Sequence, residues 1–385
     1  MSPSAHAYLS ASAAARWMGC PGSARLAAKL PDTASPASEE GTIAHAMAED
    51  LLHGKDVAGT FEHAKEFYDA HPVLGTPKEM LSYIEGYRDF VLEEFNAIKA
   101  KDPHAVLLIE QHVDFSKYVP DGFGTSDVVI IGDNLMTIID LKYGRGIRVE
   151  AQNNPQLKLY ALGAVETFSM VYDFKDVRAI IYQPRLDSIS DMSTDVDELR
   201  AWGADTVTPA ATEAMKPDAP CVPGPWCDDH FCPAAARCSA RAAHYLQLER
   251  ENYAEPDLME PEDIGEVLRI GAGLEKWLKQ VSEFALHSIL DGKAIPGFKV
   301  VEGRSTRVYT NQDAVAATLV KAGYDEALIY ERKLLGLSKM EQLLGKKAFR
   351  ETLGNLIDKP QGAPTLVPDT DKRPAFVPGT TDFDD

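Results

Sequence analysis

The sequence has no apolar run long enough to cross a bilayer, and residues 1–23 lack a basic segment followed by an apolar core. A membrane-spanning helix needs about 20 consecutive apolar residues, and a secretory signal peptide needs the second pattern. We therefore expect a cytoplasmic protein with no membrane partner. In a reducing compartment, the five cysteines are not expected to form disulfides.

Positive charge is also scarce. The chain has 39 Lys and Arg residues against 59 Asp and Glu residues, which gives a formal net charge of −20 at pH 7. This charge argues against non-specific coating of nucleic acid by the protein as a whole. It leaves room for a carboxylate metal site and a local basic groove. The most basic segment, 332–350, fits a solvated helical surface as well as it fits a nucleic-acid contact.

Apolar periodicity predicts the order helix, three strands, helix and strand through the first half of the chain. The predicted helices cover 11–18, 39–54, 78–100 and 154–168. The predicted strands cover 105–115, 125–132, 135–144 and 177–185. Further helices are predicted from 262 onward, with a strand-like piece at 297–309. This order predicts a mixed α/β fold with a central mixed sheet flanked by helices.

The strand at 135–144 carries two charged residues at the end of a branched apolar run. Asp140 and Lys142 are two residues apart, so both side chains point to the same side of the strand. If this strand forms a hairpin with the preceding one, Asp127 meets Asp140 near one end. Two adjacent carboxylates need a compensating cation or proton, and their oxygens suit Mg²⁺ or Mn²⁺. The alternative is a structural ion pair at a strand end.

Three further residues extend this candidate site. His45 lies on a predicted amphipathic helix and could supply an imidazole ligand, although a lone His is more often structural. Gln156 and Tyr160 are four residues apart on a predicted helix, so they share one face. With the metal polarising a phosphate and lowering the pKa of a bound water, Lys142 could orient or activate that water for attack on a phosphodiester.

Together these residues resemble the RecB-type nucleases of the PD-(D/E)xK superfamily, which also includes the CRISPR adaptation nucleases. The matching motifs, in the family's order, are GxxxH (Gly41 to His45), Asp127 after a Gly-rich turn, DxK (Asp140 and Lys142) and QxxxY (Gln156 and Tyr160). The resemblance implies that the metal is bound by His45, Asp127, Asp140 and the main-chain carbonyl of Leu141. It makes Lys142 the catalytic lysine. Gln156 and Tyr160 would hold the lysine and the DNA strand. Glu110 matches the family's strand acid before the turn.

A closer likeness covers most of the chain. Segments 9–23, 40–49, 138–164 and 359–375 are similar to a family of phage and prophage proteins regarded as RecB-like exonucleases. This likeness implies a metal-dependent exonuclease that acts on DNA with free ends in phage recombination or replication, inside a bacterial host cell. A phage single-strand-binding or recombination protein is the implied partner, and a homo-oligomer is an open alternative.

The resemblance also divides the chain into three parts. Residues 1–245 would form the nuclease domain, and residues 246–358 a mostly helical accessory region suited to DNA or subunit contacts. Residues 359–385 would form a Pro-rich acidic tail, because that composition does not build a packed core.

Four of the five cysteines crowd into residues 221–238, which indicates a metal site. One interpretation is a local zinc site of Cys221, Cys227, Cys232 and Cys238, with His230 as a substitute ligand. The resemblance implies a second one, a 4Fe-4S cluster held by Cys20, Cys227, Cys232 and Cys238. Four residues separate Cys227 from Cys232 where that family commonly has two, so Cys221 and Cys227 compete for one ligand position. Either site would be structural; the iron–sulfur cluster would tie the first helix to the end of the nuclease domain.

Two other classes of protein compete with an exonuclease. One is a DNA-binding recombination scaffold whose nuclease fold no longer cuts, and the other is a restriction-type endonuclease on the same fold. The presence of both Asp140 and Lys142 favours an enzyme over a scaffold. A comparison of circular with linear DNA separates the two enzymes.

Overall fold

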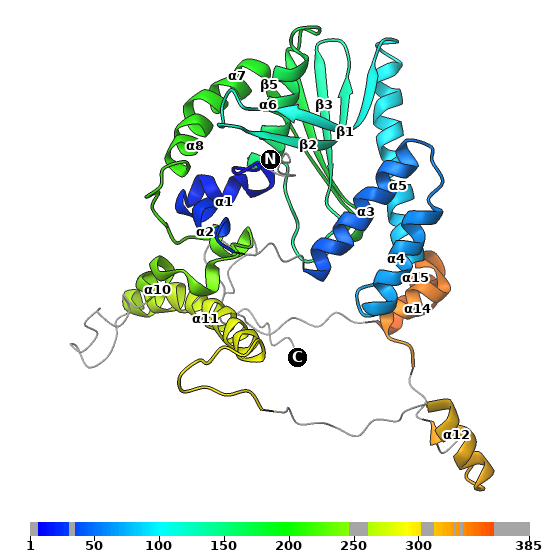
Figure 1. The fold of residues 1–385 in the computed structure, drawn as a ribbon. Coiled ribbons are helices and arrows are strands. Elements are labelled where there is room, and N and C mark those ends of the chain that lie inside the picture. The colour runs from blue at the N-terminus through cyan, green and yellow to red at the C-terminus, as the bar shows by residue number, and fades with distance from the viewer. Residues whose placement is uncertain are drawn as a thin grey trace, which may run out of the picture. The chain divides into compact units, whose positions relative to one another are not determined.

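The computed structural model describes residues 7–30, 35–245, 261–301, 312–325, 329–330 and 334–357 (Figure 1). The chain divides into two compact units, Met1–Val300 and Val301–Asp385. The second unit contains the helices α12 (Gln312–Lys321), α14 (Leu337–Leu344) and α15 (Lys346–Leu353). The expected Pro-rich tail at 359–385 lies outside the described residues.

The first unit is built around one mixed sheet of five strands in the order β1-β2-β3-β4-β5. The strands are β1 (Val106–Asp114), β2 (Phe123–Ile131), β3 (Leu135–Leu141), β4 (Asp176–Gln183) and β5 (Ser188–Asp195). Only β3 and β4 run parallel, and the other three neighbouring pairs are antiparallel. The helix α6 (Pro155–Phe168) makes the crossover that a parallel pair requires. The predicted mixed α/β fold is confirmed, and β5 is an addition to it.

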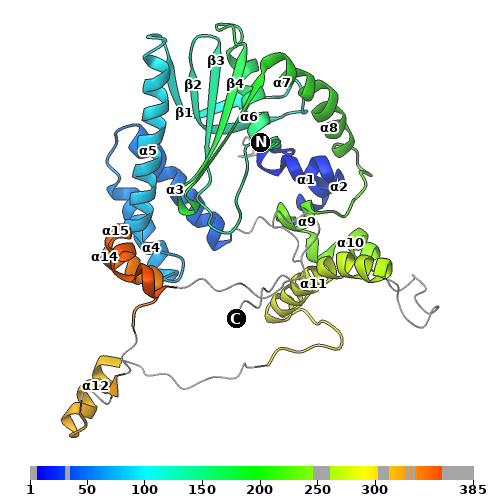
Figure 2. The same cartoon turned by 180° about the vertical axis from the view of Figure 1, so that it is seen from behind.

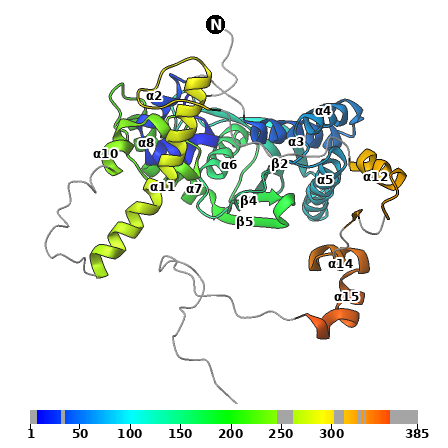
Figure 3. The same ribbon diagram turned by 90° about the horizontal axis from the view of Figure 1, so that it is seen from below.

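Helices cover both faces of this sheet (Figures 1 and 2). The helices α3 (Pro36–Leu52), α4 (Ala58–Ala70) and α5 (Pro77–Lys99) pack on one face. The other face carries α1 (Ala14–Gly19), α6, α7 (Val196–Trp202) and α8 (Thr208–Ala214). In the view of Figure 3, the two groups lie on opposite sides of the sheet. Alternation along β3 sets these two layers, because Ile138 joins the core under α6 and Ile139 joins the core under α3 to α5.

Local capping fixes where the site-bearing helices begin. Ser35, Thr76 and Asn154 each accept a backbone N–H three residues later, at the starts of α3, α5 and α6. Each of these helices has a proline as its first residue, where the missing N–H costs nothing and the fixed φ already suits a helix. The start of each helix is therefore set by its own sequence as well as by packing on the sheet.

Shorter elements follow the sheet. They are α2 (Gly22–Ala27) beside α1, then α9 (Trp226–Asp229), α10 (Ser239–Tyr245) and the long α11 (Pro261–Leu290). Arg241 of α10 forms an ion pair with Asp228 of α9 at 2.7 Å and donates to Gln280 of α11 at 2.8 Å. The helix predicted from 262 is confirmed by α11. Of the strand-like piece at 297–309, residues 297–301 form no strand, and residues 302–309 lie outside the described residues.

Candidate active site

Three acidic side chains stand in a row across the first three strands of the sheet. The register pairs Ile109 with Val128 in β1 and β2, so the next position places Glu110 opposite Asp127. The β2–β3 ladder ends at Val128 and Ile139, and one step beyond it stand Asp127 and Asp140. Residues opposite each other on neighbouring strands share a face and a position along the sheet. The hairpin expected from the sequence is therefore present, and a third acid continues its row.

Glu110 has an unusual backbone conformation for a strand residue. Its φ of 49° lies in the left-handed region, which costs a non-glycine residue on the order of 1–3 kcal/mol. The ladder keeps one register on both sides of Glu110, at Ile109 and at Gln111, so the strain comes without an inserted residue. Ligand atoms of His45, Glu110 and Asp127 lie within 4.8 Å of one another. The strained conformation thus accompanies a group suited to binding a metal ion.

His45 reaches this group from α3. Its Nδ1 lies 3.3 Å from Asp127 Oδ1. Burial lowers the pKa of His45, but the Asp127 carboxylate outweighs burial and raises that pKa to about 9. Burial raises the pKa of Glu110 to about 7, and the neighbouring Asp127 charge adds to this shift. The imidazolium of His45 is thus one cation that compensates the carboxylates, together with Lys142.

Asp127 is tied to the backbone of β3. The amide of Leu141 donates a hydrogen bond to Asp127 Oδ2 at 2.7 Å. Burial acts to raise the pKa of Asp127, but His45 and the Leu141 amide together hold it below its usual value. Leu141, whose carbonyl is the implied metal ligand, is thus held at the site through its N–H.

Asp140 and Lys142 form a pair beside these groups. Lys142 Nζ lies 2.9 Å from Asp140 Oδ2, and only 4% of Asp140 is exposed to solvent. Burial raises the pKa of Asp140, Lys142 opposes that shift, and the Asp127 charge adds to it. A buried carboxylate with a second carboxylate nearby is costly to keep charged, and a divalent cation relieves that cost.

The helix α6 completes the site from the other side of the row. Lys142 Nζ donates to Gln156 Oε1 at 3.1 Å, and Gln156 Nε2 donates to Tyr160 OH at 3.4 Å. Gly124 of the Gly-rich turn lies under the Tyr160 ring, where an added Cβ would stand 2.8 Å from a ring carbon. The four-residue spacing of Gln156 and Tyr160 thus places both side chains in one chain of hydrogen bonds that begins at Lys142.

Tyr87 of α5 is a residue that the sequence did not point to. It is buried, and burial followed by the charges of Asp127, Asp140 and Glu110 raises the pKa of its hydroxyl. Among the described residues, that hydroxyl has no hydrogen-bond partner. A buried orphan hydroxyl next to several carboxylates fits a hydrated metal ion that would supply the missing partner. Tyr87 continues the helical spacing of the buried residues Met80, Ile84 and Val91 along α5. The sequence pattern therefore predicts a core residue at this position and does not mark a site.

Replacing Tyr87 by Phe should have opposite effects on stability and on metal binding. An unpaired buried hydroxyl costs about 1–3 kcal/mol, so Y87F should raise the free energy of unfolding in a chelator by about 1 kcal/mol. With Mg²⁺ or Mn²⁺ present, the variant should bind the ion about 10- to 100-fold more weakly, as when outer partners of ligands are lost. Urea unfolding with and without metal measures both effects. Equal changes in the two conditions would show that Tyr87 only packs.

The cysteines gather at a second place, where the start of the chain meets residues 219–238. Cys20 is buried and accepts a hydrogen bond from the Val222 amide at 3.2 Å. Burial raises the pKa of the Cys20 thiol to about 11, and the nearby Cys221, Cys227 and Cys232 add to the shift. The pKa of Cys221 is raised by burial and then by Cys238. All five cysteines are therefore electrostatic neighbours in one cluster.

Main-chain contacts hold the two segments around these cysteines together. The Gly22 amide donates to Pro220 O at 2.8 Å, and Arg16 donates to His230 O at 3.2 Å. The Trp226 ring covers Gly19, where an added Cβ would stand 2.5 Å from it. Residues about 200 positions apart thus form one clasp, and Cys20 lies in it together with the later cysteines.

The fold and the sites define a mixed α/β protein with one carboxylate-rich centre and one cysteine cluster. Residues 6–374 match the model of the family described as "Protein of unknown function (DUF2800)", so the chain belongs to this family. Among the described residues, no helix is both long and apolar enough to cross a membrane.

Two solved structures are similar to parts of this chain. One is the crystal structure of a protein from Eubacterium rectale described as a "Putative exonuclease", with 11% identity and a TM-score of 0.31. That match covers 67% of this chain and 92% of the other. The second is the crystal structure of SSO0001, with 16% identity and a TM-score of 0.22, covering 46% of this chain and 81% of the other.

Proposed function

We propose that this protein is a Mg²⁺- or Mn²⁺-dependent deoxyribonuclease of the RecB-like PD-(D/E)xK type that degrades DNA from free ends. One observation carries the proposal: Asp127, Asp140 and Lys142 meet where the β2–β3 ladder ends, with His45 and Glu110 beside them. Three carboxylates that are largely removed from water favour the binding of a cation. The lysine beside them is suited to hold an attacking water and a negatively charged phosphate. The motif order of the RecB-type nucleases supports the same assignment.

The chain's own groups divide the work of phosphodiester hydrolysis. His45, Asp127, Asp140 and the Leu141 carbonyl would hold the ion, with Glu110 as a further oxygen donor. When bound, the ion polarises the phosphate and lowers the pKa of a bound water. Water oxygen attacks phosphorus, the bond from phosphorus to the leaving oxygen breaks, and a proton passes to that leaving oxygen.

Lys142 is held ready for that step by two fixed partners. An ammonium group has three N–H donors, and Lys142 directs them toward Asp140 at 2.9 Å and Gln156 at 3.1 Å. From this position the ammonium would hold the attacking water or a phosphate oxygen. Tyr160, hydrogen-bonded to Gln156, would steady this arrangement and contact the DNA strand. Positioning of this kind is a large part of catalysis in phosphoryl transfer.

We also propose that the cysteine cluster binds a structural 4Fe-4S cluster, with Cys20 as the ligand from the start of the chain. Cys20 accepts a hydrogen bond from the Val222 amide, and it lies near enough to Cys221, Cys227 and Cys232 for them to raise its pKa. A local zinc site of Cys221, Cys227, Cys232 and Cys238 would leave Cys20 out, so the place of Cys20 among these cysteines supports the iron–sulfur assignment.

By the same resemblance, the biological setting that we propose is phage DNA recombination or replication in a bacterial host cell. The substrate would be DNA with free ends, handed over by a phage single-strand-binding or recombination protein. Retention of the Asp140 and Lys142 pair favours this role over that of a non-cleaving scaffold.

Degradation of end-labelled linear DNA, compared with closed circular DNA of the same sequence, tests the function. Protein purified without oxygen should degrade linear DNA only, with Mg²⁺ or Mn²⁺ and not with a chelator, and K142A should degrade it far more slowly. Cleavage of the circle would instead indicate a restriction-type endonuclease. If the wild type binds DNA but leaves both forms intact, the scaffold alternative holds.

A further inference from the structure

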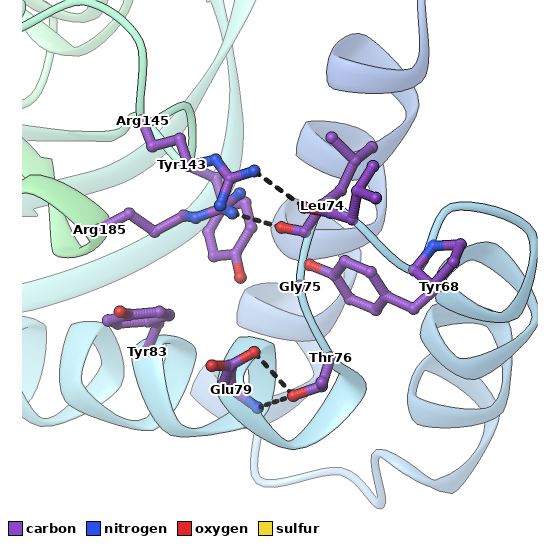
Figure 4. A pocket seen from close by; sticks show the side chains of 11 residues that line it. Tyr68, Leu74, Gly75, Thr76, Glu79, Tyr83, Tyr143, Arg145 and Arg185 are labelled. Atoms are coloured by element: carbon purple, nitrogen blue, oxygen red, sulfur yellow. Dashed lines mark hydrogen bonds between the residues drawn. The ribbon is translucent and has the colours of Figure 1, made fainter. Parts of the chain in front are cut away.

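A pocket of about 340 Å³ opens beside the acidic row, outside the residues assigned so far (Figure 4). Tyr143 and Arg145, which follow β3, form one side of it, and Arg185, which follows β4, forms another. The rest comes from Tyr68 of α4, from the loop between α4 and α5, and from Glu79 and Tyr83 of α5. The pocket thus lies at the carboxyl ends of the parallel strands, where open α/β sheets bind ligands.

The pocket adjoins the proposed catalytic centre through two shared elements. Tyr143 is the residue after Lys142, so their Cα atoms are about 3.8 Å apart. Glu40 lies on α3, five residues before His45. Its carboxylate accepts from Tyr68 OH at 2.7 Å and pairs with Arg185 at 2.7 Å. The wall of the pocket and the candidate metal site are therefore linked through α3 and through the segment that follows β3.

The two arginines of the pocket have different electrostatic environments. The Arg185 side chain is only 7% exposed, is neutralised by Glu40, and donates to Leu74 O at 2.7 Å. Arg145 is exposed and donates to Val73 O at 3.3 Å. Within the described part of the chain, Arg145 makes no ion pair. Its guanidinium keeps most of its five donors and an uncompensated charge, which suits a phosphate group.

Two tyrosines of the pocket, Tyr143 and Tyr83, differ in how far their rings are available to a ligand. The guanidinium of Arg185 lies 4.9 Å from the centre of the Tyr143 ring, so that ring is already covered by a cation. Tyr83 meets the Tyr143 ring edge-on at 6.3 Å and remains 38% exposed. Figure 4 places Tyr83 and Arg145 around the same space. An exposed tyrosine ring is a surface on which a nucleobase can stack.

We propose that this pocket binds one nucleotide of a single strand, with its base on Tyr83 and its phosphate on Arg145. The proposal rests on the nuclease function and deepens it, because it makes single-stranded ends the substrate. Bases in a duplex are stacked on each other and are not free to stack on a side chain. The pocket volume of about 340 Å³ is at the lower end of the range for small-molecule sites. It therefore has room for one unpaired nucleotide. The neighbouring phosphate would then lie at Lys142.

Binding of a fluorescently labelled single-stranded oligonucleotide, followed by anisotropy in a chelator that prevents cleavage, tests the pocket directly. Y83A and R145Q should each weaken binding about tenfold. R145Q should also flatten the dependence of log K on log salt by about 0.7, the value for one phosphate contact on a single strand. Y83A should leave that slope unchanged. Both side chains are exposed, so neither change should disturb the fold.

Two surface variants provide the matched controls. Arg148 is exposed and paired with Glu150 at 2.8 Å, so R148Q removes an arginine three residues from Arg145 without touching the pocket. Tyr8 is exposed, so Y8A removes a surface tyrosine elsewhere. Both controls should bind the oligonucleotide as the wild type does. Wild-type affinity and slope in Y83A and R145Q would overturn the proposal.

Three further results distinguish a DNA strand from a single nucleotide as the ligand, and failure of the pocket proposal from failure of the proposed nuclease function. If a deoxynucleoside monophosphate displaces the oligonucleotide at concentrations near the oligonucleotide's own Kd, the assignment to a strand is wrong. If the wild type degrades linear DNA and the pocket variants bind normally, the pocket proposal fails and the nuclease stands. If the wild type cuts nothing but both pocket variants lose binding, the pocket stands and the nuclease fails.

Discussion

Replacing Lys142 by Ala should lower the rate of linear DNA degradation about 10²- to 10⁴-fold, the range for loss of a group that assists proton transfer. The lysine is held by Asp140 and Gln156, and neither partner can take over its role because Asp140 accepts hydrogen bonds and Gln156 is uncharged. Lys142 is not an implied metal ligand, so the rise in Tm caused by Mg²⁺ or Mn²⁺ should persist in K142A. Single-turnover degradation and thermal unfolding measure these two properties.

Asp140→Asn is the variant that separates the lysine's role from that of the metal. It should lose activity and the metal-dependent rise in Tm together, because a binding ion stabilises only a protein that holds it. Lys175→Ala controls for the lysine change, since Lys175 is exposed and precedes β4 at the opposite end of the sheet. Undiminished degradation by K142A, with K175A equally active, would remove Lys142 from the mechanism.

Cys20→Ser should lower the bound iron and the stability of the protein together. Cys20 lies in the clasp between α1 and residues 219–238, where it also accepts from the Val222 amide. Losing a ligand releases a cluster whose binding free energy contributes to folding. We expect iron below half of the wild-type content and a Tm lower by roughly 10 °C, a change of several kcal/mol for a domain of this size. Iron analysis and thermal unfolding of protein prepared without oxygen measure this.

The surplus cysteine supplies the control for that prediction. A 4Fe-4S cluster takes four thiolates, and the chain has five cysteines. One of the variants C221S and C227S should therefore keep its iron and its Tm, and the other should behave like C20S. Zinc in place of iron in the wild type, with C20S unaffected, would instead support the local zinc site.

Most of the sheet and its main helices followed from periodicity, because each has one strongly apolar side. The strand β5 and the helix α4 escaped prediction for a physical reason. The sequence of β5, "SISDMSTD", has only two large apolar residues, Ile189 and Met192. They are three positions apart and so point to opposite faces of the strand, with Met192 buried and Ile189 exposed, which leaves no apolar alternation to recognise. In α4, the buried residues are Ala64, Phe67 and Tyr68, and the small and polar residues around them weaken the apolar stripe.

Part of the candidate site could be predicted from the sequence, because a motif relates residues that are close together in the chain. Asp140 with Lys142, and Gln156 with Tyr160, are pairs of this kind. Their approach to His45 depends on how α3 packs on the sheet, and only the resemblance anticipated it. The left-handed backbone of Glu110 and the unpaired hydroxyl of Tyr87 arise from tertiary packing. No local pattern marks them, and the same is true of the pocket around Tyr83.

The helix α3 carries Glu40 and His45 about 7.5 Å apart along its axis. Glu40 anchors the pocket wall through Arg185, and His45 faces Asp127. If binding at one of these places shifts α3, the free energies of binding at both are linked. Thermodynamic reciprocity then requires that the factor by which a metal ion tightens DNA binding equals the factor by which DNA tightens metal binding. Under the proposed function, a single helix would then make the protein hold its metal best when a strand end is in place.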